Sequence, residues 1–483
     1  MSAPWEPVIG LEVHAQLLTK SKMFCGCRAQ YLGLPPNSNT CPVCLGLPGT
    51  LPVMNSRAVE FTIRTALALN CRIPEFTKFD RKNYFYPDLP KGYQISQYDL
   101  PLSVDGWLEF EVGDRSVRAG ITRVHLEEDA GTLHHAGEIH TSPFSLVDLN
   151  RAGVPLMEIV GEPDLRAPEE APAYLAALRQ TLMYLGVNDG NMEEGSLRCD
   201  ANISLRRPGA TALGAKVEVK NMNSFRSIQR ALEYECKRQA DLLDSGQTVA
   251  QETRGWSDLE QVTVSQRSKE EAQEYRYFPE PDLPPLLVSR DQVEELRRGL
   301  PELPQAKRLR LREQYGISAD QARIIAEQAG DADYYEQVVA AGAGPAAAAN
   351  WQVQNLQALC NAARVRVGEC KVPAVALAEL VKLVEADRVS GSVAKEVLAE
   401  AFASGANPTD LVVRRGLTQV SDSGELMKMV EQALMGNQKA AADYKAGNDR
   451  ALGSLVGAVM ALSQGKANPK VVNQLLRERL PRP

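Results

Sequence analysis

At 483 residues, with 24% charged and 44% hydrophobic residues, the chain is too long for one hydrophobic core, and we expect two to four domains. The formal net charge of −7 argues against a protein that coats nucleic acid nonspecifically, although an acidic total can include a locally basic face. We find no apolar run of about 18 residues and no basic start followed by a hydrophobic block. We therefore expect a cytoplasmic protein without a membrane segment.

Residues 8–17 (VIGLEVHAQL) alternate between apolar and polar side chains, which predicts a half-buried strand. Glu12 and His14 then stand on one face, roughly 7 Å apart, as metal ligands or as an acid and a base. The alternative is an ordinary solvated face. Three further stretches offer polar faces of the same kind, which favours a shared pocket: 125–129, 198–202 and 216–221.

Four cysteines form two close pairs, Cys25-Gly-Cys27 and Cys41-Pro-Val-Cys44. Two such pairs on two turns are typical of a tetrahedral thiolate site for zinc, and four unligated thiols in a loop are the alternative. Because cysteine fills all four positions, the metal would be structural rather than catalytic. The other five cysteines are scattered singly, and we expect them to be reduced.

A helix is predicted over 57–70, and an aromatic and polar segment with two prolines and a glycine follows at 80–98. We expect this segment to be mostly loop. Lys82, Lys91 and its tyrosines are candidates to meet a phosphate and a nucleobase, or else the rings simply pack the loop down.

Short strands are predicted over 107–112, 116–126 and 145–150. Three acids, Glu127, Glu128 and Asp129, crowd the end of the second strand. Like charges at such short separations are costly unless a cation neutralises them. This favours a Mg²⁺ site over a solvated turn. The stretch 148–159 reads as a strand, a polar turn and another strand, and it places further polar residues near strand ends: Asp148, Asn150 and Glu158.

A helix over 168–185 precedes a predicted strand over 196–205. Arg198, Asp200 and Asn202 share one face of this strand, which is either a cleft wall or a plain solvent-facing side. A further strand at 216–220 leads into a helix through Ala231 and Cys236, after which strand signals dwindle.

From residue 291 the sequence becomes helix-rich, and it contains no further chemical signal, so we interpret this region as a helical spacer. Gly, Asn and Pro at 404–408 mark a second boundary, and the helices beyond it are mildly basic. We predict three domains: 1–290 with the cysteine knuckle, 291–405 and 406–483. Predicted helices lie at 292–298, 302–315, 318–329, 331–341, 346–363, 375–387, 408–416, 423–435, 438–446, 451–463 and 468–479.

The sequence contains no phosphate-binding G-x-x-x-x-G-K-[ST] loop, no G-x-G-x-x-G and no G-x-S-x-G. A protein that uses ATP without such a loop would hold it through Mg²⁺ and side chains. Phosphoryl transfer permits this, because positioning and charge neutralisation supply most of the catalysis.

Several motifs together closely resemble the B-subunit family of the bacterial tRNA-dependent amidotransferase. The resemblance covers essentially the whole chain, tail included. Its motifs are VIGLEVHAQ (8–16), the cysteines of 25–44, KNYFYPDLPKGYQISQ (82–97), HLEEDAG (125–131), DLNRAGVPLME (148–158), RCDAN (198–202), EVKNMNSF (218–225) and RYFPEPD (276–282).

The resemblance implies an α+β fold, with a mixed-sheet cradle domain, a helical domain and a small all-helical tail that contacts tRNA. It implies conversion of misacylated Glu-tRNA(Gln) or Asp-tRNA(Asn) to the amide form, through phosphorylation of the side-chain carboxylate by ATP and displacement of phosphate by ammonia. Ammonia would come from glutamine hydrolysed on the amidase component of a heterotrimer, which the small third component joins to this chain. An aminoacyl-tRNA synthetase is a further candidate partner.

Carried onto this sequence, the resemblance implies that Glu12, His14, Glu127 and Glu128 form a catalytic cluster around Mg²⁺. His14 is the weakest ligand, because Mg²⁺ prefers oxygen. Whether His14 or a carboxylate is the base in the amidation step stays open, as does the preferred tRNA. Substrate-binding candidates are Lys82 and Tyr84 for the phosphate or the aminoacyl end, and Arg198, Asp200 and Asn202 for the cleft wall.

Two other functions stay open at this point. The chain could be a non-catalytic scaffold that presents tRNA while a partner performs all chemistry. It could also be a stand-alone metal-dependent hydrolase, which should act without tRNA. The crowded acids of 127–129 argue against a scaffold, since a phosphate-binding surface gains nothing from negative charge there.

Overall fold

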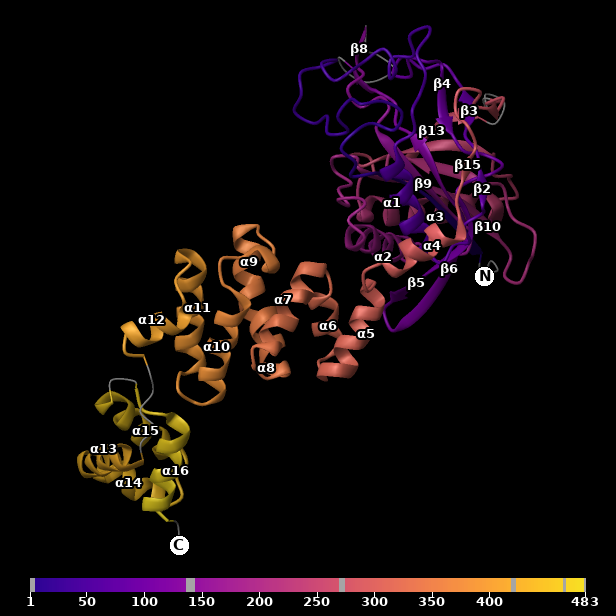
Figure 1. Ribbon diagram of the computed structural model, residues 1–483. Helices are drawn as coiled ribbons and strands as arrows, with labels where there is room; N and C mark the ends of the chain where they lie inside the picture. The colour runs from indigo at the N-terminus through magenta and orange to yellow at the C-terminus, as the bar shows by residue number, and fades with distance from the viewer. Residues whose placement is uncertain (1–4, 136–143, 269–273, 418–422, 464–465, 482–483) are drawn as a thin grey trace. The chain divides into compact units, whose positions relative to one another are not determined.

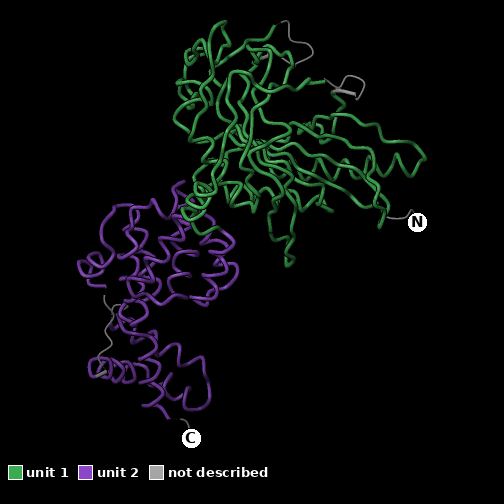
Figure 2. The backbone as a smooth tube through the Cα atoms, turned by 45° about the vertical axis from the view of Figure 1, so that its right-hand side comes forward, with its two compact units in different colours: residues 1–303 green, residues 304–483 purple. Residues whose placement is uncertain are grey.

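The computed structural model describes residues 5–135, 144–268, 274–417, 423–463 and 466–481. The chain divides into two compact units, residues 1–303 and 304–483, which Figure 2 colours separately. Within the described ranges, no helix has both the length and the hydropathy needed to cross a bilayer.

The first unit is built on one eight-stranded mixed sheet (Figure 1). Neighbouring strands are antiparallel, except for β11 and β12, which run parallel and are separated in the chain by a helix. The first strand, β1, lies inside the sheet, between strands that come from later parts of the chain. The order across the sheet is β13 (Val262–Ser268), β12 (Glu252–Ser257), β11 (Val217–Lys220), β10 (Leu197–Arg206), β1 (Glu6–Gln16), β9 (Pro155–Gly161), β6 (Arg115–Glu128) and β5 (Ser103–Val112).

The alternation of β1 determines which face of the sheet is core. Leu11 and Val13 are at most 2% exposed and belong to the hydrophobic core, whereas Glu12 and His14 point to the other face. Three helices supply the other half of that core and contact β6, β5 and β10 respectively: α1 (Ser56–Ala68), α2 (Glu170–Tyr184) and α3 (Phe225–Asp244). The polar side chains of β1 are therefore turned away from the apolar layer.

Small sheets add to the main one. β3 (Asp80–Asn83) pairs with β4 (Tyr93–Ser96) and with β14 (Phe278–Pro279). The segment 80–98 was predicted to be mostly loop, and it contains two short strands, β3 and β4, that pair with each other, while β3 also pairs with residues about 200 positions later in the chain. The expectation that strands dwindle after 244 was wrong, since β12 and β13 complete one edge of the main sheet. Two further pairs are β2 (Phe76–Thr77) with β15 (Leu286–Leu287), and β7 (Thr132–His135) with β8 (Ser145–Asp148).

The second unit is helical, which confirms the predicted α+β class of a mixed-sheet domain followed by helices. It contains two hydrophobic clusters, one within 311–412 and one within 426–480. The predicted helix over 346–363 is divided by a π-helical turn, Gln352–Leu356. The α-helices are α5 (Pro304–Tyr315), α6 (Ala319–Ile325), α7 (Ala329–Ala340), α8 (Pro345–Trp351), α9 (Gln357–Ala363), α10 (Ala374–Glu385), α11 (Gly391–Ser404), α12 (Pro408–Arg414), α13 (Ser423–Gly436), α14 (Gln438–Lys445), α15 (Arg450–Leu462) and α16 (Pro469–Arg479).

The two compact units meet in the chain at 303/304. Helix α4 (Arg290–Arg298) belongs to the first unit, because its Val293 and Leu296 pack against the core of that unit. The three-domain division at 290 and 405 stays a prediction.

Candidate active site

A row of polar side chains crosses three adjacent strands on the polar face of the sheet. In the strand register His14 of β1 lies opposite Glu158 of β9, and Glu158 lies opposite His125 of β6. Glu127 follows His125 on the same face of β6, one pleat further along. Strand pairing therefore brings together residues that are 144 positions apart in the sequence.

Distances within this row show that its polar atoms converge. His14 Nε2 lies 3.6 Å from Glu127 Oε1 and 3.8 Å from Glu158 Oε2. His125 Nε2 lies 3.1 Å from Glu158 Oε2 and orients that carboxylate. Ligand atoms of His14, Glu127 and Glu158 all lie within 4.8 Å of one another, which is close enough for them to hold one metal ion. We call these three residues the acidic cluster.

The two carboxyl groups of the acidic cluster have opposite electrostatic environments. Burial raises the pKa of Glu127, and the charge of Glu158 raises it further. Burial alone would also raise the pKa of Glu158, but His125, His14 and Lys82 together lower it below its ordinary value. Glu127 therefore binds a proton more tightly than Glu158 does, and a bound cation would relieve the repulsion between the two carboxylates.

Lys82 approaches the acidic cluster from β3. Burial alone would lower its pKa, but Glu127, and less strongly Tyr277 and Glu158, raise it above the usual value. Its ammonium also lies 4.8 Å from the ring centre of Tyr275 and 5.9 Å from that of Tyr84. Lys82 is thus a protonated cation that lies against an aromatic wall and is influenced by the charges of both carboxylates.

The aromatic wall is a group of tyrosines from two distant segments. Tyr84 contacts Tyr275 edge to face, Tyr275 contacts Tyr277, and Tyr277 stacks on Tyr98 with ring centres 4.2 Å apart. Tyr98 is half exposed. The tyrosine group therefore offers ring faces beside the acidic cluster, where a planar base or a sugar can pack.

Arg198 also lies near the cluster, since β10 places it opposite His14. Its Nη2 donates to Asp129 Oδ2 at 3.0 Å, and Gln16 Nε2 donates to the same oxygen at 2.8 Å. Asp129 raises the pKa of Arg198, so this guanidinium stays charged. The third acid of the predicted 127–129 group thus serves as the anchor of an arginine.

Glu12 does not join the acidic cluster but belongs to a second polar group on β1, β10 and β11. Asn202 Nδ2 donates to Glu12 Oε1 at 2.8 Å, and Lys220 Nζ lies 2.5 Å from Asp200 Oδ2 and 3.1 Å from Glu218 Oε1. The Oδ1 atom of Asn202 is buried without a partner. The predicted cleft-wall residues Asp200 and Asn202 therefore surround Glu12.

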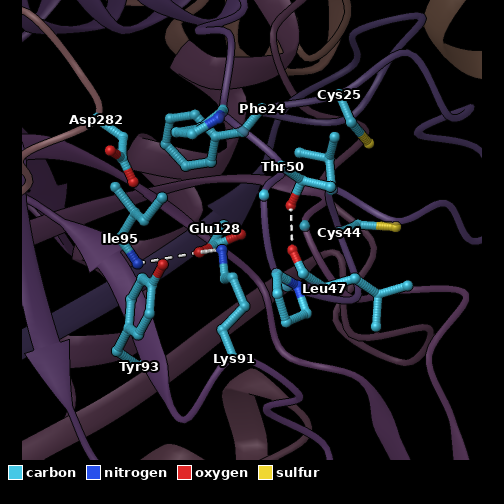
Figure 3. Close-up of a pocket in the computed structure, with 16 residues that line it drawn as sticks. Phe24, Cys25, Cys44, Leu47, Thr50, Lys91, Tyr93, Ile95, Glu128 and Asp282 are labelled. Atoms are coloured by element: carbon cyan, nitrogen blue, oxygen red, sulfur yellow. Dashed lines mark hydrogen bonds and ion pairs between the residues drawn. The ribbon is translucent and has the colours of Figure 1, made fainter.

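Glu128 is also apart from the acidic cluster, because it points to the opposite side of β6 from Glu127. Its carboxylate pairs with Lys91 and accepts the backbone N–H of Ile95 at 3.0 Å (Figure 3). Both side chains of the Lys91–Glu128 pair are at most 8% exposed. The structure thus does not bring the four predicted residues to one point: His14 and Glu127 meet, with Glu158 as the third member, while Glu12 and Glu128 have other partners.

The four predicted cysteines do converge. One sulfur from each of Cys25, Cys27, Cys41 and Cys44 lies within 4.8 Å of the other three. A hydrogen bond with Cys25 keeps the pKa of the Cys44 thiol below its usual value, and the backbone N–H of Cys41 donates to the same sulfur at 3.1 Å. Four thiols at this spacing fit a tetrahedral metal such as zinc. We call the segment 25–44 the knuckle.

The knuckle forms one wall of a cavity of about 200 Å³. Figure 3 shows Cys25 and Cys44 on one side of this cavity and Lys91, Tyr93 and Glu128 on the other. Gly46 has a positive φ of 66°, and a Cβ there would lie 3.2 Å from the Cα of Lys91. The turn after the knuckle therefore packs directly on the lysine that pairs with Glu128.

Sequence reasoning missed two members of the site. Glu158 was recognised only as a polar residue near a strand end, and His125 was quoted in a motif without a role. The periodicity of the two strands was the available signal for both residues. Glu158 interrupts an apolar run in β9, and His125 precedes Glu127 by two positions in β6. Only the register of β1, β9 and β6 adds the information that these positions face His14.

Comparisons with known proteins identify the family of the chain. The family description "GatB/GatE catalytic domain" matches residues 7–294, and "GatB domain" matches residues 333–480. The chain is 52% identical to the B subunit of the aspartyl/glutamyl-tRNA(Asn/Gln) amidotransferase of Carboxydothermus hydrogenoformans, over 99% of both chains. The corresponding proteins of Thermomicrobium roseum and Brevibacillus brevis are 52% and 50% identical, over 99% and 98% of both chains. The resemblance inferred from the motifs is thereby confirmed: the chain belongs to the B-subunit family of aspartyl/glutamyl-tRNA(Asn/Gln) amidotransferases.

Proposed function

We propose that this chain is the transamidating component of a tRNA-dependent amidotransferase. It converts misacylated Glu-tRNA(Gln), Asp-tRNA(Asn) or both to the amide form in an ATP-dependent reaction. Ammonia reaches it from a glutaminase partner, the amidase component of a heterotrimer in which a small third component holds the two together. The names of the relatives support tRNA-dependent transamidation, and the absence of a G-x-S-x-G motif is consistent with glutamine hydrolysis on another chain.

The observation that carries the proposal is the meeting of His14, Glu127 and Glu158 beside Lys82. A carboxylate is a poor electrophile, and its activation requires a phosphoryl group on one oxygen. The site has to accept two anions, the substrate carboxylate and the phosphate chain, although two acidic side chains are already present. A cation at the acidic cluster, together with Lys82 and Arg198, supplies the positive charge for this.

The acidic cluster fits Mg²⁺. Its two carboxylates face each other, one with a raised and one with a lowered pKa, and few fixed cations lie between them. Glu127 and Glu158 would hold the ion through oxygen, and His14 would contribute directly or through water. When bound, ATP and Mg²⁺ would supply the phosphoryl group that turns the side-chain carboxylate into an acyl phosphate and neutralise the charge on that group.

The remaining side chains have separate roles in this proposal. Lys82 binds a phosphate oxygen, and the tyrosine group packs against the terminal nucleoside of the tRNA. Arg198, anchored by Asp129, contacts the anionic substrate. His14 accepts the proton that ammonia loses on attack when it contacts the ion through water, because a nitrogen bound directly to the metal has no free lone pair. Glu12, Asp200 and Asn202 form the adjoining wall.

The knuckle is proposed as a structural zinc site, since its four thiols leave no open coordination position. The mildly basic helices after residue 405 are proposed to contact tRNA, with an aminoacyl-tRNA synthetase as a further candidate partner. Both assignments are separate from the chemistry at the acidic cluster.

Amidation by the reconstituted complex tests the proposal, with glutaminase activity measured in parallel. His14→Ala should abolish amidation of misacylated tRNA, with glutamine or with ammonium chloride as the nitrogen source, while glutamine hydrolysis by the partner stays measurable. Glu162→Gln, at an exposed carboxylate just beyond β9 that bonds Thr122, provides a control for changing a polar side chain away from the acidic cluster. Unchanged amidation in His14→Ala would contradict the active-site assignment.

The competing scaffold function predicts no turnover of ATP by this chain. Hydrolysis of ATP that depends on misacylated tRNA and is lost in His14→Ala would exclude a scaffold. A stand-alone metal-dependent hydrolase would instead act without tRNA, so comparing activity with and without charged tRNA separates the third function. Assaying both charged tRNAs in the same experiment identifies the preferred substrate.

A further inference from the structure

Lys22 is a buried cation outside the proposed active site. It lies between the end of β1 and the knuckle, and with 1% exposure it ranks among the largest fully buried side chains. Lysine is almost never fully buried without a partner, because removing its charge from water is costly. Among the residues that the structure describes, no carboxylate lies within 4.0 Å of its ammonium. The anion that pairs with Lys22 has to be of another kind.

The contacts of Lys22 all lead to the knuckle. Its Nζ donates to the backbone oxygen of Asn39 at 2.9 Å and lies 3.8 Å from Cys44 Sγ. Its backbone N–H donates to the oxygen of Cys27 at 2.8 Å. A Cβ on Gly153 would lie 3.5 Å from both Lys22 Cδ and Cys44 Cβ, so the lysine stem packs closely beside the cysteine. The side chain is therefore fixed with its charge directed at the thiol group.

The thiol cluster is the anion that this geometry offers. Four thiolates around Zn²⁺ carry two net negative charges, and their burial is costly unless nearby donors or cations compensate them. Partners outside the ligand shell of a metal site often orient its ligands and tune its affinity.

We propose that Lys22 is the buried counter-charge of the metal-loaded knuckle, acting on the metal through Cys44. The inference rests on the proposed zinc site and deepens it. Without metal Lys22 faces the one thiol whose pKa is lowered, Cys44, whereas beside a metal thiolate cage it faces two net negative charges, so it stabilises the loaded knuckle more than the empty one. Lys22 is accordingly a positioning and charge-balancing residue rather than a ligand.

Zinc affinity of the full-length chain tests the proposal, with Lys22→Met and Lys22→Gln as variants. Methionine keeps the length of the stem without its charge, and glutamine keeps a donor for the Asn39 oxygen. Lys20→Gln is the matched control, because Lys20 lies on the same segment and is exposed. Competition with a chelating indicator measures the zinc dissociation constant, and thermal unfolding is compared between zinc-loaded and chelator-stripped protein.

We expect both Lys22 variants to bind zinc about 10- to 100-fold more weakly than wild type, as for other partners outside the ligand shell, and the control to be unchanged. Their unfolding temperature should fall clearly further in loaded protein than in stripped protein, where Lys22 faces at most the Cys44 thiolate. The larger loss in loaded protein separates charge balance from simple packing.

Three results would overturn the proposal. Equal zinc affinity in wild type and the Lys22 variants would remove the counter-charge while leaving the zinc site intact. An equal loss of stability with and without zinc, or no folded variant in either state, would give Lys22 a structural role that is independent of the metal. Wild-type protein that binds no zinc would overturn the knuckle assignment and this inference together.

Discussion

The knuckle and the acidic cluster are both groups of potential metal ligands, but they are assembled in different ways. The knuckle takes its four sulfurs from 20 consecutive residues, and two tight turns suffice to bring them together. The acidic cluster takes three side chains from β1, β6 and β9, and it exists only when the register of the sheet is correct. The knuckle can therefore form when its own segment folds. The acidic cluster forms only when the strands of the sheet pair in the correct register.

This difference suggests where each site is vulnerable. Substitutions in the knuckle should first affect metal content and stability. Activity should change only as a consequence of those two effects. Substitutions in the acidic cluster should affect activity with little change in the fold, because these side chains lie on the polar face and outside the hydrophobic core.

The largest effect is expected for Glu158→Gln. It removes the ionised carboxylate that His14 and His125 both approach, and amidation should fall on the order of 100-fold or more, as for other groups that stabilise charge in a transition state. Glu162→Gln is a matched control just beyond the same strand, since Glu162 is exposed and bonds only Thr122 through its side chain in the described structure. Steady-state amidation by the reconstituted complex is the measurement. A loss of equal size in both variants would show that the effect does not come from the cluster.

The second largest effect is expected for Gly46→Ala, which links the knuckle to Lys91. Gly46 and Gly49 both have positive φ, but only at Gly46 would a Cβ meet Lys91. Strain and overpacking at Gly46 should lower the free energy of unfolding by about 1–3 kcal/mol more than the strain alone at Gly49→Ala. Urea unfolding of both variants, with zinc content determined alongside, tests this. Equal losses in the two variants would mean that the turn does not support the Lys91–Glu128 pair.

Glu127→Gln gives a smaller and pH-dependent effect. Because burial and Glu158 raise the pKa of Glu127 in the folded state, its ionisation is costly there, and wild-type stability should fall as the pH rises through that raised pKa. Below the pKa of the unfolded state both forms are protonated and the cost is absent. In metal-free protein, Glu127→Gln should therefore gain stability over wild type at pH 8 relative to pH 4.

Urea unfolding followed by tryptophan fluorescence, in the presence of a chelator, measures this gain. Adding Mg²⁺ at pH 8 should stabilise wild type and leave Glu127→Gln largely unchanged, because the variant has lost a ligand. If the free energies of unfolding of Glu127→Gln and wild type differed by the same amount from pH 4 to pH 8, the raised pKa of Glu127 would be contradicted.

The same contrast explains what could be predicted from the sequence. The alternation of 8–17 predicted β1 and its polar face, and the cysteine spacing predicted the convergence of four thiols, because both signals are local. Helices such as α1, α2 and α3 were predicted from their apolar period for the same reason. These predictions required no knowledge of which strands pair.

What the sequence could not predict depends on pairing between distant segments. Glu127 and Glu128 are adjacent in the chain, yet they face opposite sides of β6, and only Glu127 meets His14. The strands β3 and β4 form in a segment rich in loop signals, and one of their partners is β14. Glu12 was grouped with the metal ligands by its motif, whereas the register places it opposite Asp200 and its carboxylate accepts a hydrogen bond from Asn202.

One divalent cation is expected to bind between Glu127 and Glu158 next to His14. Anomalous scattering from crystals of the assembled complex soaked with Mn²⁺, which accepts the same oxygen ligands as Mg²⁺, would locate this ion. We expect a peak within bonding distance of both carboxylates, and loss of that peak in Glu158→Gln. A peak only among Glu12, Asp200 and Glu218, or none on this face of the sheet, would contradict this expectation.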